Sequence, residues 1–500
     1  MKVSISYPPI RSNKGVPLLS QNRQFQYFSE PTYIYPVVAG YAATLLSQAD
    51  CEVIWDDAIA EEKGYQDWLR HIERTKPDLM MIETKTPVVK EHWMAVDDVK
   101  LVSPETKVAL VGDHVTVLPR ESMENSKIDY VIEGGDYDFL LLNLVRYLDG
   151  KERRLESGVW YRQDGEMKST GPFKLDHALD ALPFIDRDLT KWQLYAYKNG
   201  NFKTTPGTYM MVGRDCWWRK DGGCTFCSWP TLYPSYRVMS PARALDEIGF
   251  LIDRFGIKEL FDDTGTFPAG HWLEEFCSGV LKRGYHERVR FGCNARFGLL
   301  KQEDYRLMKR AGFRMLLFGL ESANQATLNR LNKGITIDDI GNGCKWAREA
   351  GLEPHITIMV GYPWETREDA ENTLRLAQEL MVKGRAVTLQ ATIVIPYPGT
   401  VLYKEALENG WLRVGPKDYE RFDMEEPVLT TADMSPDELV EICDNIYKIF
   451  LQPEYVLRHL TRIRSLRDMS FTARGLVKVL GHVKDFAGER APGKKKSQEA

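Results

Sequence analysis

Three cysteines stand close enough in the sequence to bind metal together. Cys216, Cys224 and Cys227 fall within twelve residues, with seven residues in the first gap and two in the second. Three thiolates on one loop can hold three irons of a four-iron cluster, and the fourth iron is then open to bind a substrate or cofactor directly. A zinc site is the main alternative, but structural zinc normally takes four ligands, and no His or Cys stands at a suitable short spacing to complete the set. The pattern therefore favours an iron-sulfur cluster.

The rest of the composition indicates an ordinary soluble protein in a reducing compartment. The other five cysteines are scattered, which is typical of core thiols rather than of a disulfide framework. Met1 to Pro9 lacks the features of a signal peptide, and no window approaches 18 uninterrupted apolar residues. These features predict a cytoplasmic, non-spanning protein. The net charge of -5 gives no reason to expect nucleic acid as a partner. The five scattered residues are Cys51, Cys277, Cys293, Cys344 and Cys443.

The cysteines follow the first of six strand-like segments that alternate with helix-length intervals. Six parallel strands with intervening helices predict a partial (β/α)6 barrel, in which a site lies at the carboxyl ends of the strands. The polar residues discussed below come directly after these segments. The segments are Tyr209 to Val212, Glu259 to Phe261, Val289 to Gly292, Met315 to Phe318, His355 to Val360, and Thr388 to Ile395.

A second alternation of strands and helices precedes the barrel. It predicts a doubly wound, flavodoxin-like parallel sheet with helices on both faces, whose ligands bind at the carboxyl edge. From the pattern alone, a scaffold domain without a ligand is an open alternative. The strand-like segments are Lys2 to Tyr7, Glu52 to Trp55, Leu79 to Glu83, Val108 to Gly112, and Tyr130 to Glu133.

These patterns divide the chain into four parts: an α/β domain over residues 1–145, a structured linker over 146–200, the barrel over 201–425, and a helical C-terminal region with a disordered tail over 426–500. The linker contains a predicted hairpin from Val159 to Lys168 that turns at Asp164-Gly165. In the C-terminal region, Ser435 precedes a helix that opens on Pro436. Eleven Lys and Arg residues between Arg458 and Lys496 suggest either peripheral contact with a membrane or a solvated helical face.

Short motifs stand in the cysteine loop and after the barrel strands. They are Cys224-Thr-Phe-Cys227-Ser-Trp-Pro230, Tyr236-Arg237, Glu247 in the following helix, Asp262-Asp263-Thr264, Asn294-Ala-Arg296, Phe318-Gly-Leu-Glu321-Ser322, and Val360-Gly361-Tyr362-Pro363. In these motifs and in its order of domains, the chain resembles the cobalamin-binding radical S-adenosylmethionine family over nearly its whole length. The family's first cysteine gap is three residues rather than seven, and a glycine-containing loop can accommodate this insertion.

The resemblance implies a set of residues that bind S-adenosylmethionine beside the 4Fe-4S cluster. It places Phe226 at the adenine, Asp263 and Thr264 at the methionine end, and Glu321 and Ser322 at the ribose or carboxylate. Asn294 and Arg296 can hold the cofactor carboxylate, Arg being suited to bidentate recognition. Gly361 would let the backbone approach the adenosine, whereas a simple turn is the alternative for this residue. A structural salt bridge is the alternative for Glu321.

In the first domain, two loops resemble the cobalamin loops of the family. Gly112, His114 and Thr116 belong to the loop after the fourth strand, and Glu133 and Gly134 to the loop after the fifth. No histidine in the chain is preceded two positions earlier by aspartate, so the D-x-H-x-x-G motif that supplies a cobalt ligand is missing. We therefore expect cobalamin to bind without histidine coordination. A domain that has lost cobalamin is the alternative.

The expected activity follows from the resemblance. An electron supplied by a donor such as flavodoxin or ferredoxin would cleave S-adenosylmethionine reductively to a deoxyadenosyl radical, most often to methylate an unactivated carbon of a small-molecule or lipid-like substrate. The alternatives are radical oxidative cyclisation or rearrangement of a lipid or tetrapyrrole, and a non-catalytic cobalamin or iron-sulfur sensor.

Overall fold

The computed structural model describes residues 1–12, 14–19, 25–28, 31–460 and 469. The first sheet has the strand order β4-β1-β5-β6-β7-β8-β9. Its first five strands run parallel, and their order along the chain is that of a flavodoxin-like doubly wound sheet, as predicted. The strands are β1 (Lys2–Tyr7), β4 (Glu52–Asp57), β5 (Leu79–Glu83), β6 (Lys107–Val111), β7 (Tyr130–Ile132), β8 (Val159–Gln163) and β9 (Glu166–Ser169).

Helices cover both faces of this sheet because successive strand residues point to opposite sides. Val3 and Ile5 pack into one hydrophobic cluster with α1 (Val37–Gln48) and α6 (Tyr137–Leu148). Met80 and Ile82 pack into a second cluster with α2 (Tyr65–Thr75) and α3 (Val89–Val102). All four strand side chains are fully buried. This explains the near-continuous apolar runs in the sequence.

The predicted hairpin forms and continues the first sheet. β8 pairs antiparallel with β7, and β9 pairs with β8. Asp164 and Gly165 connect the two strands with φ values of +54° and +80°, the left-handed conformations that a two-residue turn requires. The first sheet therefore extends to Ser169, beyond the domain boundary expected at residue 145. The reason is that β8 and β9, which the sequence pattern assigns to a linker, pair along the outer edge of β7.

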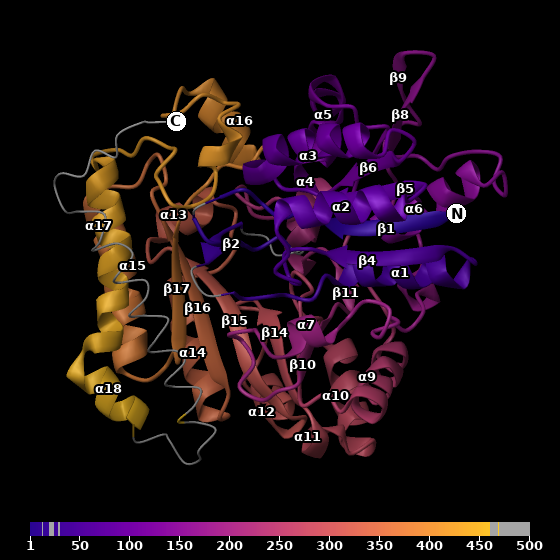
Figure 1. Cartoon of the computed structure of the whole chain (residues 1–500). Coiled ribbons are helices and arrows are strands. Elements are labelled where there is room, and N and C mark those ends of the chain that lie inside the picture. The colour runs from indigo at the N-terminus through magenta and orange to yellow at the C-terminus, as the bar shows by residue number, and fades with distance from the viewer. Residues whose placement is uncertain (13, 20–24, 29–30, 461–468, 470–500) are drawn as a thin grey trace.

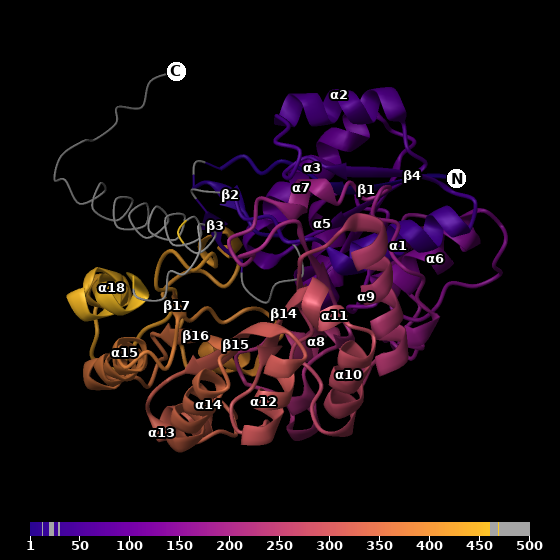
Figure 2. The same cartoon turned by 90° about the horizontal axis from the view of Figure 1, so that it is seen from below.

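Six parallel strands form the second sheet in the order β10-β13-β14-β15-β16-β17, the partial barrel that the sequence predicts. The strands are β10 (Gly207–Met210), β13 (Glu259–Asp262), β14 (Arg290–Ala295), β15 (Phe313–Glu321), β16 (Glu353–Val360) and β17 (Thr388–Ile393). Helices line the outside of this curved sheet (Figure 2): α9 (Pro241–Phe255), α10 (His271–Lys282), α12 (Gln302–Arg310), α14 (Ile337–Glu349) and α15 (Arg367–Val382).

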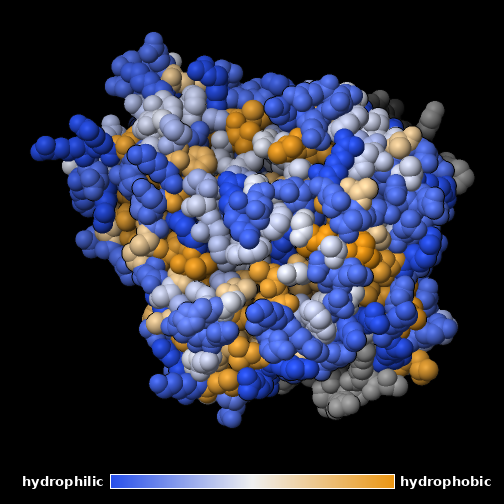
Figure 3. Space-filling view, turned by 180° about the vertical axis from the view of Figure 1, so that it is seen from behind, coloured by the Kyte–Doolittle hydropathy of each residue, from blue (hydrophilic) through white to orange (hydrophobic). Residues whose placement is uncertain are grey.

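The C-terminal region begins with the predicted helix. Ser435 caps α17 (Pro436–Tyr447) in a capping box with Glu438. Tyr447 at the end of this helix hydrogen-bonds the backbone of Ala391, so α17 covers the outer strand β17. α18 (Pro453–Leu460) follows, and most of the basic segment lies outside the described residues. Among the residues described, no helix is long and apolar enough to cross a membrane. Apolar side chains form separate patches between polar ones on the face in Figure 3.

The two sheets are joined end to end. The first unit lies against one end of the barrel strands (Figure 1). A buried ion pair crosses between them: Arg214 Nη2 lies 2.8 Å from Asp138 Oδ2, and both side chains are almost fully buried. The remaining short elements that matter for the site are α4 (Asp113–Val117), β11 (Gly213–Arg214), η3 (Trp217–Asp221), α8 (Trp229–Leu232), β12 (Arg237–Val238), α13 (Gln325–Arg330) and η4 (Tyr419–Arg421).

Candidate functional site

The three predicted cluster ligands lie on the loop between β11 and α8. Cys216 precedes η3, and its Sγ lies 2.8 Å from Thr266 Oγ1. The backbone N–H of Cys227 donates to the carbonyl of Cys224 at 3.1 Å, which closes a tight turn between these two ligands. All three cysteines are partly buried and free of disulfides. One loop therefore presents three thiols beside the barrel end.

The electrostatic surroundings of this loop suit an anionic cluster. Burial raises the pKa of the Cys224 thiol, and the charges of Lys333 and Arg296 act in the opposite direction. No three His, Cys, Asp or Glu side chains in the described part of the chain are placed to hold a single metal ion. A four-iron cluster makes a different demand, because each thiolate binds its own iron and the thiols stand apart around the cluster. The donor set fits such a group.

Glu321 ends β15 and is paired with a lysine. Its Oε1 lies 2.6 Å from Lys333 Nζ, and both side chains are buried. The register of β15 against β16 shifts between Gly319 and Glu321, and Glu321 has a φ of +65°. A bulge of this kind redirects a side chain at the end of a strand. A carboxylate that already holds a lysine still has lone pairs for ribose hydroxyls.

Residues at the carboxyl ends of β13 and β14 hold each other in place. Asn294 Nδ2 donates to Asp263 Oδ1 at 3.2 Å and to the carbonyl of Thr264 at 3.0 Å. Thr264 Oγ1 accepts from the N–H of Gly213 at 2.9 Å, on the strand that leads to the cysteines. The structure thus brings together three of the predicted residues. It uses the Thr264 side chain to fix the backbone of the cluster loop.

Asp262, which the sequence analysis did not single out, supports the same loop. Its carboxylate accepts from the N–H groups of Val212 at 2.8 Å and Thr264 at 3.1 Å. Burial raises its pKa to about 7. Its position next to Asp263 was the available signal, but sequence alone does not tell which of two adjacent carboxylates faces inward.

Arg296 has an unused hydrogen-bond donor. Its guanidinium lies 4.2 Å from the centre of the Trp218 ring, a cation–π contact. The side chain is buried, and Nη2 has no hydrogen-bond partner among the described residues. A buried guanidinium donor without a partner is costly unless an anionic group satisfies it. Arg296 therefore fits a ligand carboxylate.

Phe226, Ser322 and Gly361 are placed differently from one another. The Phe226 ring lies 6.0 Å from Lys333 Nζ, beside Glu321 and the cysteines. Ser322 Oγ is buried and contacts Thr373 of α15 at 3.4 Å, so its hydroxyl binds the outer helix layer. Gly361 has a φ of +96°, and a Cβ there would lie 2.5 Å from Leu439 of α17. A glycine is thus needed at 361 for the turn and for the covering helix.

Glu365 is a second carboxylate that the sequence analysis did not find. Its Oε2 accepts from the N–H of Gly361 at 2.6 Å, and burial raises its pKa to about 8. It lies four residues beyond the motif glycine, in the loop that opens α15. Its role in the structure is to bind the backbone of that loop.

The two predicted cobalamin loops are tied to each other at the edge of the first sheet. Thr116 Oγ1 donates to the carbonyl of Gly112 at 2.7 Å and accepts from the N–H of Gly134 at 3.0 Å. Gly112 has a φ of +118°, and a Cβ there would lie 2.1 Å from the carbonyl oxygen of Thr84. Glycine is therefore required at 112 by the backbone of the neighbouring loop.

His114 and Glu133 are directed into the protein. The His114 ring is buried, with Nδ1 3.3 Å from Thr86 Oγ1 and an edge-on contact to Tyr419 at 4.6 Å. Glu133 Oε1 accepts from Trp160 Nε1 at 2.7 Å, and burial raises its pKa. Neither residue, nor Thr116, lines the cavity described next, whereas Gly112 and Gly134 do.

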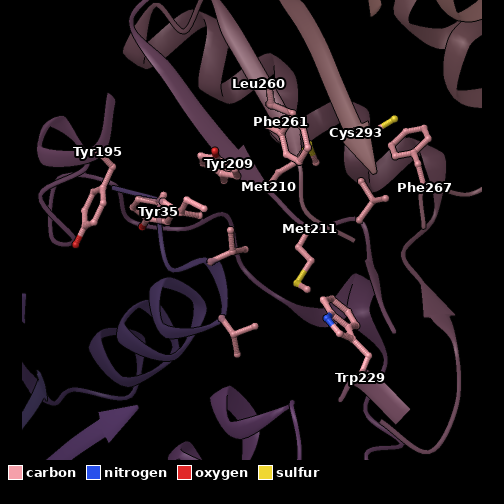
Figure 4. Packing of buried hydrophobic residues seen from close by; sticks show 14 of the residues in the cluster. Tyr35, Tyr195, Tyr209, Met210, Met211, Trp229, Leu260, Phe261, Phe267 and Cys293 are labelled. Carbon is pink, nitrogen blue, oxygen red and sulfur yellow. The ribbon is translucent and has the colours of Figure 1, made fainter. Parts of the chain in front are cut away.

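A cavity lies between the carboxyl edge of the first sheet and the cluster loop. The space between its walls is about 470 Å³ when the part open to solvent is included. Glu83 stands at the end of β5 and accepts hydrogen bonds from Tyr7 at 2.6 Å and Tyr137 at 3.1 Å. On the cluster side, Met211 lies next to Trp229 (Figure 4). The cavity is lined by Glu83, Thr84, Lys85, Gly112, Asp113, Gly134, Gly135, Tyr137, Met211, Ser228, Trp229, Leu232 and Tyr233.

Known proteins resemble the chain in both sequence and fold. Residues 210–377 match the Radical SAM superfamily model. An uncharacterized methyltransferase of Pyrococcus horikoshii is 24% identical over 431 residues, which cover 85% of this chain and 90% of the relative. The anaerobic magnesium-protoporphyrin IX monomethyl ester cyclase of Cereibacter sphaeroides is 24% identical over 405 residues, covering 79% and 63%. The radical S-adenosylmethionine methyltransferase TsrM from Kitasatospora setae, solved with cobalamin and a 4Fe-4S cluster, matches with a TM-score of 0.66 at 15% identity over 91% and 90%.

The part of the barrel that carries the cysteine loop thus matches the Radical SAM superfamily. The doubly wound sheet in front of the barrel gives the chain the fold of TsrM, and both findings support the resemblance seen in the sequence. That neighbour was solved with two of the three cofactors expected here, cobalamin and a 4Fe-4S cluster.

Proposed function

We propose that this enzyme methylates an unactivated carbon of a small-molecule or lipid-like substrate. The observation that supports the proposal most directly is the cavity, because its walls come from three strand ends of the first sheet and from the residues just after Cys227. When bound, the cluster with S-adenosylmethionine supplies a radical that removes a hydrogen atom, and cobalamin carries the methyl group. The substrate would lie where both cofactors reach it.

In this proposal the residues of the barrel hold the first two cofactors. Cys216, Cys224 and Cys227 bind three irons. Arg296 would donate the Nη2–H that no described residue accepts to the carboxylate of S-adenosylmethionine, and Glu321 would accept hydrogen bonds from the ribose. Both side chains are buried, so bulk water does not compete for these bonds.

The first domain would hold cobalamin chiefly through its backbone. Gly112 and Gly134 let the two loops stand against a flat macrocycle, and Lys85 and Asp113 provide charged groups at the rim. None of the histidines in the described part of the chain lines the cavity, which supports cobalamin binding without imidazole coordination. A flavodoxin or ferredoxin remains the proposed electron donor.

A second candidate function is oxidative cyclisation or rearrangement of a lipid or tetrapyrrole. The relative from Cereibacter sphaeroides favours it, since that protein is a cyclase of a magnesium porphyrin. Both reactions begin with the same hydrogen abstraction, so they differ in whether a methyl group is transferred to the substrate.

The test is an anaerobic reconstitution with S-adenosylmethionine and a reductant, with and without cobalamin, followed by mass spectrometry. Methylation predicts deoxyadenosine and S-adenosylhomocysteine, the latter only when cobalamin is present. Deoxyadenosine alone in both samples would favour oxidative cyclisation or rearrangement. Formation of neither compound by cluster-loaded protein would contradict both functions.

A further inference from the structure

The insertion between Cys216 and Cys224 is anchored to a turn in the barrel. Trp218 Nε1 donates to the backbone carbonyl of Asn332 at 2.6 Å. Asn332 Nδ2 in turn donates to the carbonyls of Asp221 at 2.7 Å and Gly223 at 2.8 Å. One further bond joins the N–H of Thr225 to the carbonyl of Leu331 at 3.0 Å. Four hydrogen bonds therefore fasten residues 218–225 to residues 331–332.

The shapes of the two segments match as well. The Trp218 ring occupies the space beside Gly334, where a Cβ would lie 2.1 Å from the ring. The ring also lies 4.2 Å from the guanidinium of Arg296. Asn332 has a φ of +50°, a left-handed conformation that Asn adopts more readily than most residues. The turn can thus direct one amide at two carbonyls of the cluster loop.

The same turn carries Lys333, which binds the carboxylate at the end of β15. Its Nζ lies 2.6 Å from Glu321 Oε1 and 6.0 Å from the Phe226 ring, which precedes Cys227. The turn therefore bonds the cluster loop through one residue and the carboxylate that ends β15 through the next.

We propose that Asn332 and Trp218 are positioning residues, which hold the insertion on this turn so that Cys224 and the Lys333–Glu321 pair keep a fixed geometry for S-adenosylmethionine. This inference rests on the proposed binding of a cluster and of S-adenosylmethionine. It assigns a purpose to the seven-residue gap: the longer loop supplies the indole and the two carbonyls through which the barrel fixes the cluster ligands.

The sharpest variant is Asn332→Asp, because it keeps the size and the left-handed conformation but replaces the donor by a carboxylate that faces two carbonyl oxygens. Trp218→Phe keeps an aromatic ring but removes the N–H that bonds Asn332 and the part of the indole that lies beside Gly334. Asn409→Asp is the matched control, since Asn409 Nδ2 also donates to a backbone carbonyl, that of Glu405 at 2.8 Å, on an exposed helix end.

The measurements are iron content, S-adenosylmethionine affinity by equilibrium dialysis, and the electron paramagnetic resonance spectrum of the reduced cluster before and after S-adenosylmethionine is added. We expect Asn332→Asp to retain its iron, bind S-adenosylmethionine roughly tenfold more weakly, and show a smaller spectral change on binding. Hydrogen exchange in the cofactor-free protein should become faster over residues 221–225. Trp218→Phe should show the same changes at smaller size.

If Asn332→Asp and Trp218→Phe keep the parent's S-adenosylmethionine affinity and spectral response, the inference is overturned, even if their thermal stability is lowered. Effects of equal size in Asn409→Asp would also overturn it. If Asn332→Asp does not fold, Trp218→Phe decides by the same criteria. Parent protein that forms no cluster or binds no S-adenosylmethionine would instead overturn the proposed function.

Discussion

The two units use the polar residues at their strand ends in different ways. At the barrel end, Arg296 Nη2 and Tyr362 Oη are buried and have no hydrogen-bond partner within the described residues. At the first sheet, Thr116 joins Gly112 to Gly134, and Glu133 holds Trp160, whereas Thr84 Oγ1 on the cavity wall is buried without a partner among the described residues. Buried polar groups are nearly always satisfied in native proteins, so open ones point to a ligand. The barrel thus offers a guanidinium and a phenol to a ligand, whereas the first sheet offers one hydroxyl and backbone.

The largest expected effect separates the cysteines at the barrel end from those elsewhere. Cys224→Ala and Cys227→Ala should each abolish the iron-sulfur absorption almost completely, because each removes one of three ligands. Cys277→Ala is the control, since Cys277 is buried in α10 and should leave the absorption intact. Iron analysis after anaerobic reconstitution measures the loss. A normal cluster in Cys216→Ala would show that the assignment across the seven-residue gap is wrong.

The next effect tests whether Glu321 acts on a ligand. Glu321→Gln removes the charge and should weaken S-adenosylmethionine binding about tenfold, since charge-assisted hydrogen bonds to the ribose become neutral ones. Glu353→Gln is the control: Glu353 also forms an ion pair, partly buried and 2.6 Å from Arg314 Nη1, but at the opposite end of the barrel. That variant should lose stability and keep the parent affinity. Equal affinity in Glu321→Gln and the parent would exclude the carboxylate from the site.

At the first sheet the corresponding substitution should affect folding rather than a ligand contact. Thr116→Val keeps the shape and removes both hydrogen bonds of the hydroxyl, leaving the N–H of Gly134 buried, at a cost of about 1–3 kcal/mol in unfolding free energy. Denaturant unfolding of cofactor-free protein measures this cost. S-adenosylmethionine affinity should not change. A weakened affinity in a variant of full stability would contradict the structural role assigned to Thr116.

The smallest expected effect is a change in how the free energy of unfolding depends on pH. His92 in α3 is fully buried, and burial lowers its pKa to about 3. In the unfolded chain this imidazole takes up a proton near pH 6.5. Its contribution to the free energy of unfolding is therefore fully present above that pH and falls as the pH is lowered, by about 1 kcal/mol at pH 6. His92→Leu should therefore gain stability relative to the parent as the pH is lowered from 8 to 5. The control is His271→Gln, because the His271 side chain is 90% exposed.

The barrel should respond in the opposite sense through Asp262. The pKa of Asp262 is raised to about 7 in the folded protein. Its contribution to the free energy of unfolding is therefore present near pH 4 and is lost as the pH rises toward 7. Asp262→Asn should gain stability relative to the parent as the pH rises over this range. Comparison at equal pH cancels the other titrating groups. A His92 variant that follows the parent at every pH would contradict the buried, neutral imidazole.

Much of the architecture was predictable because hydrophobic periodicity is local. All eleven parallel strands were placed within a few residues, since buried strands are runs of apolar residues. The Asp164-Gly165 turn and the Ser435 cap could also be predicted from the sequence, because each is determined by neighbouring residues. The pairing of β8 with β7 was not, since strand pairing depends on which edge is free in the folded sheet.

The sequence by itself determined the order of the two α/β units, the cysteine loop and the strand ends at which polar residues gather. Only the tertiary structure decided which of those residues face the cavity. His114 turns toward Tyr419, and Glu133 turns toward Trp160, whereas Glu83 stands on the cavity wall. The physical reason is that a strand end fixes where a backbone lies, while the direction of a side chain is set by partners that are distant in the sequence: Trp160 lies 27 residues from Glu133, and Asn332 lies 109 from Gly223.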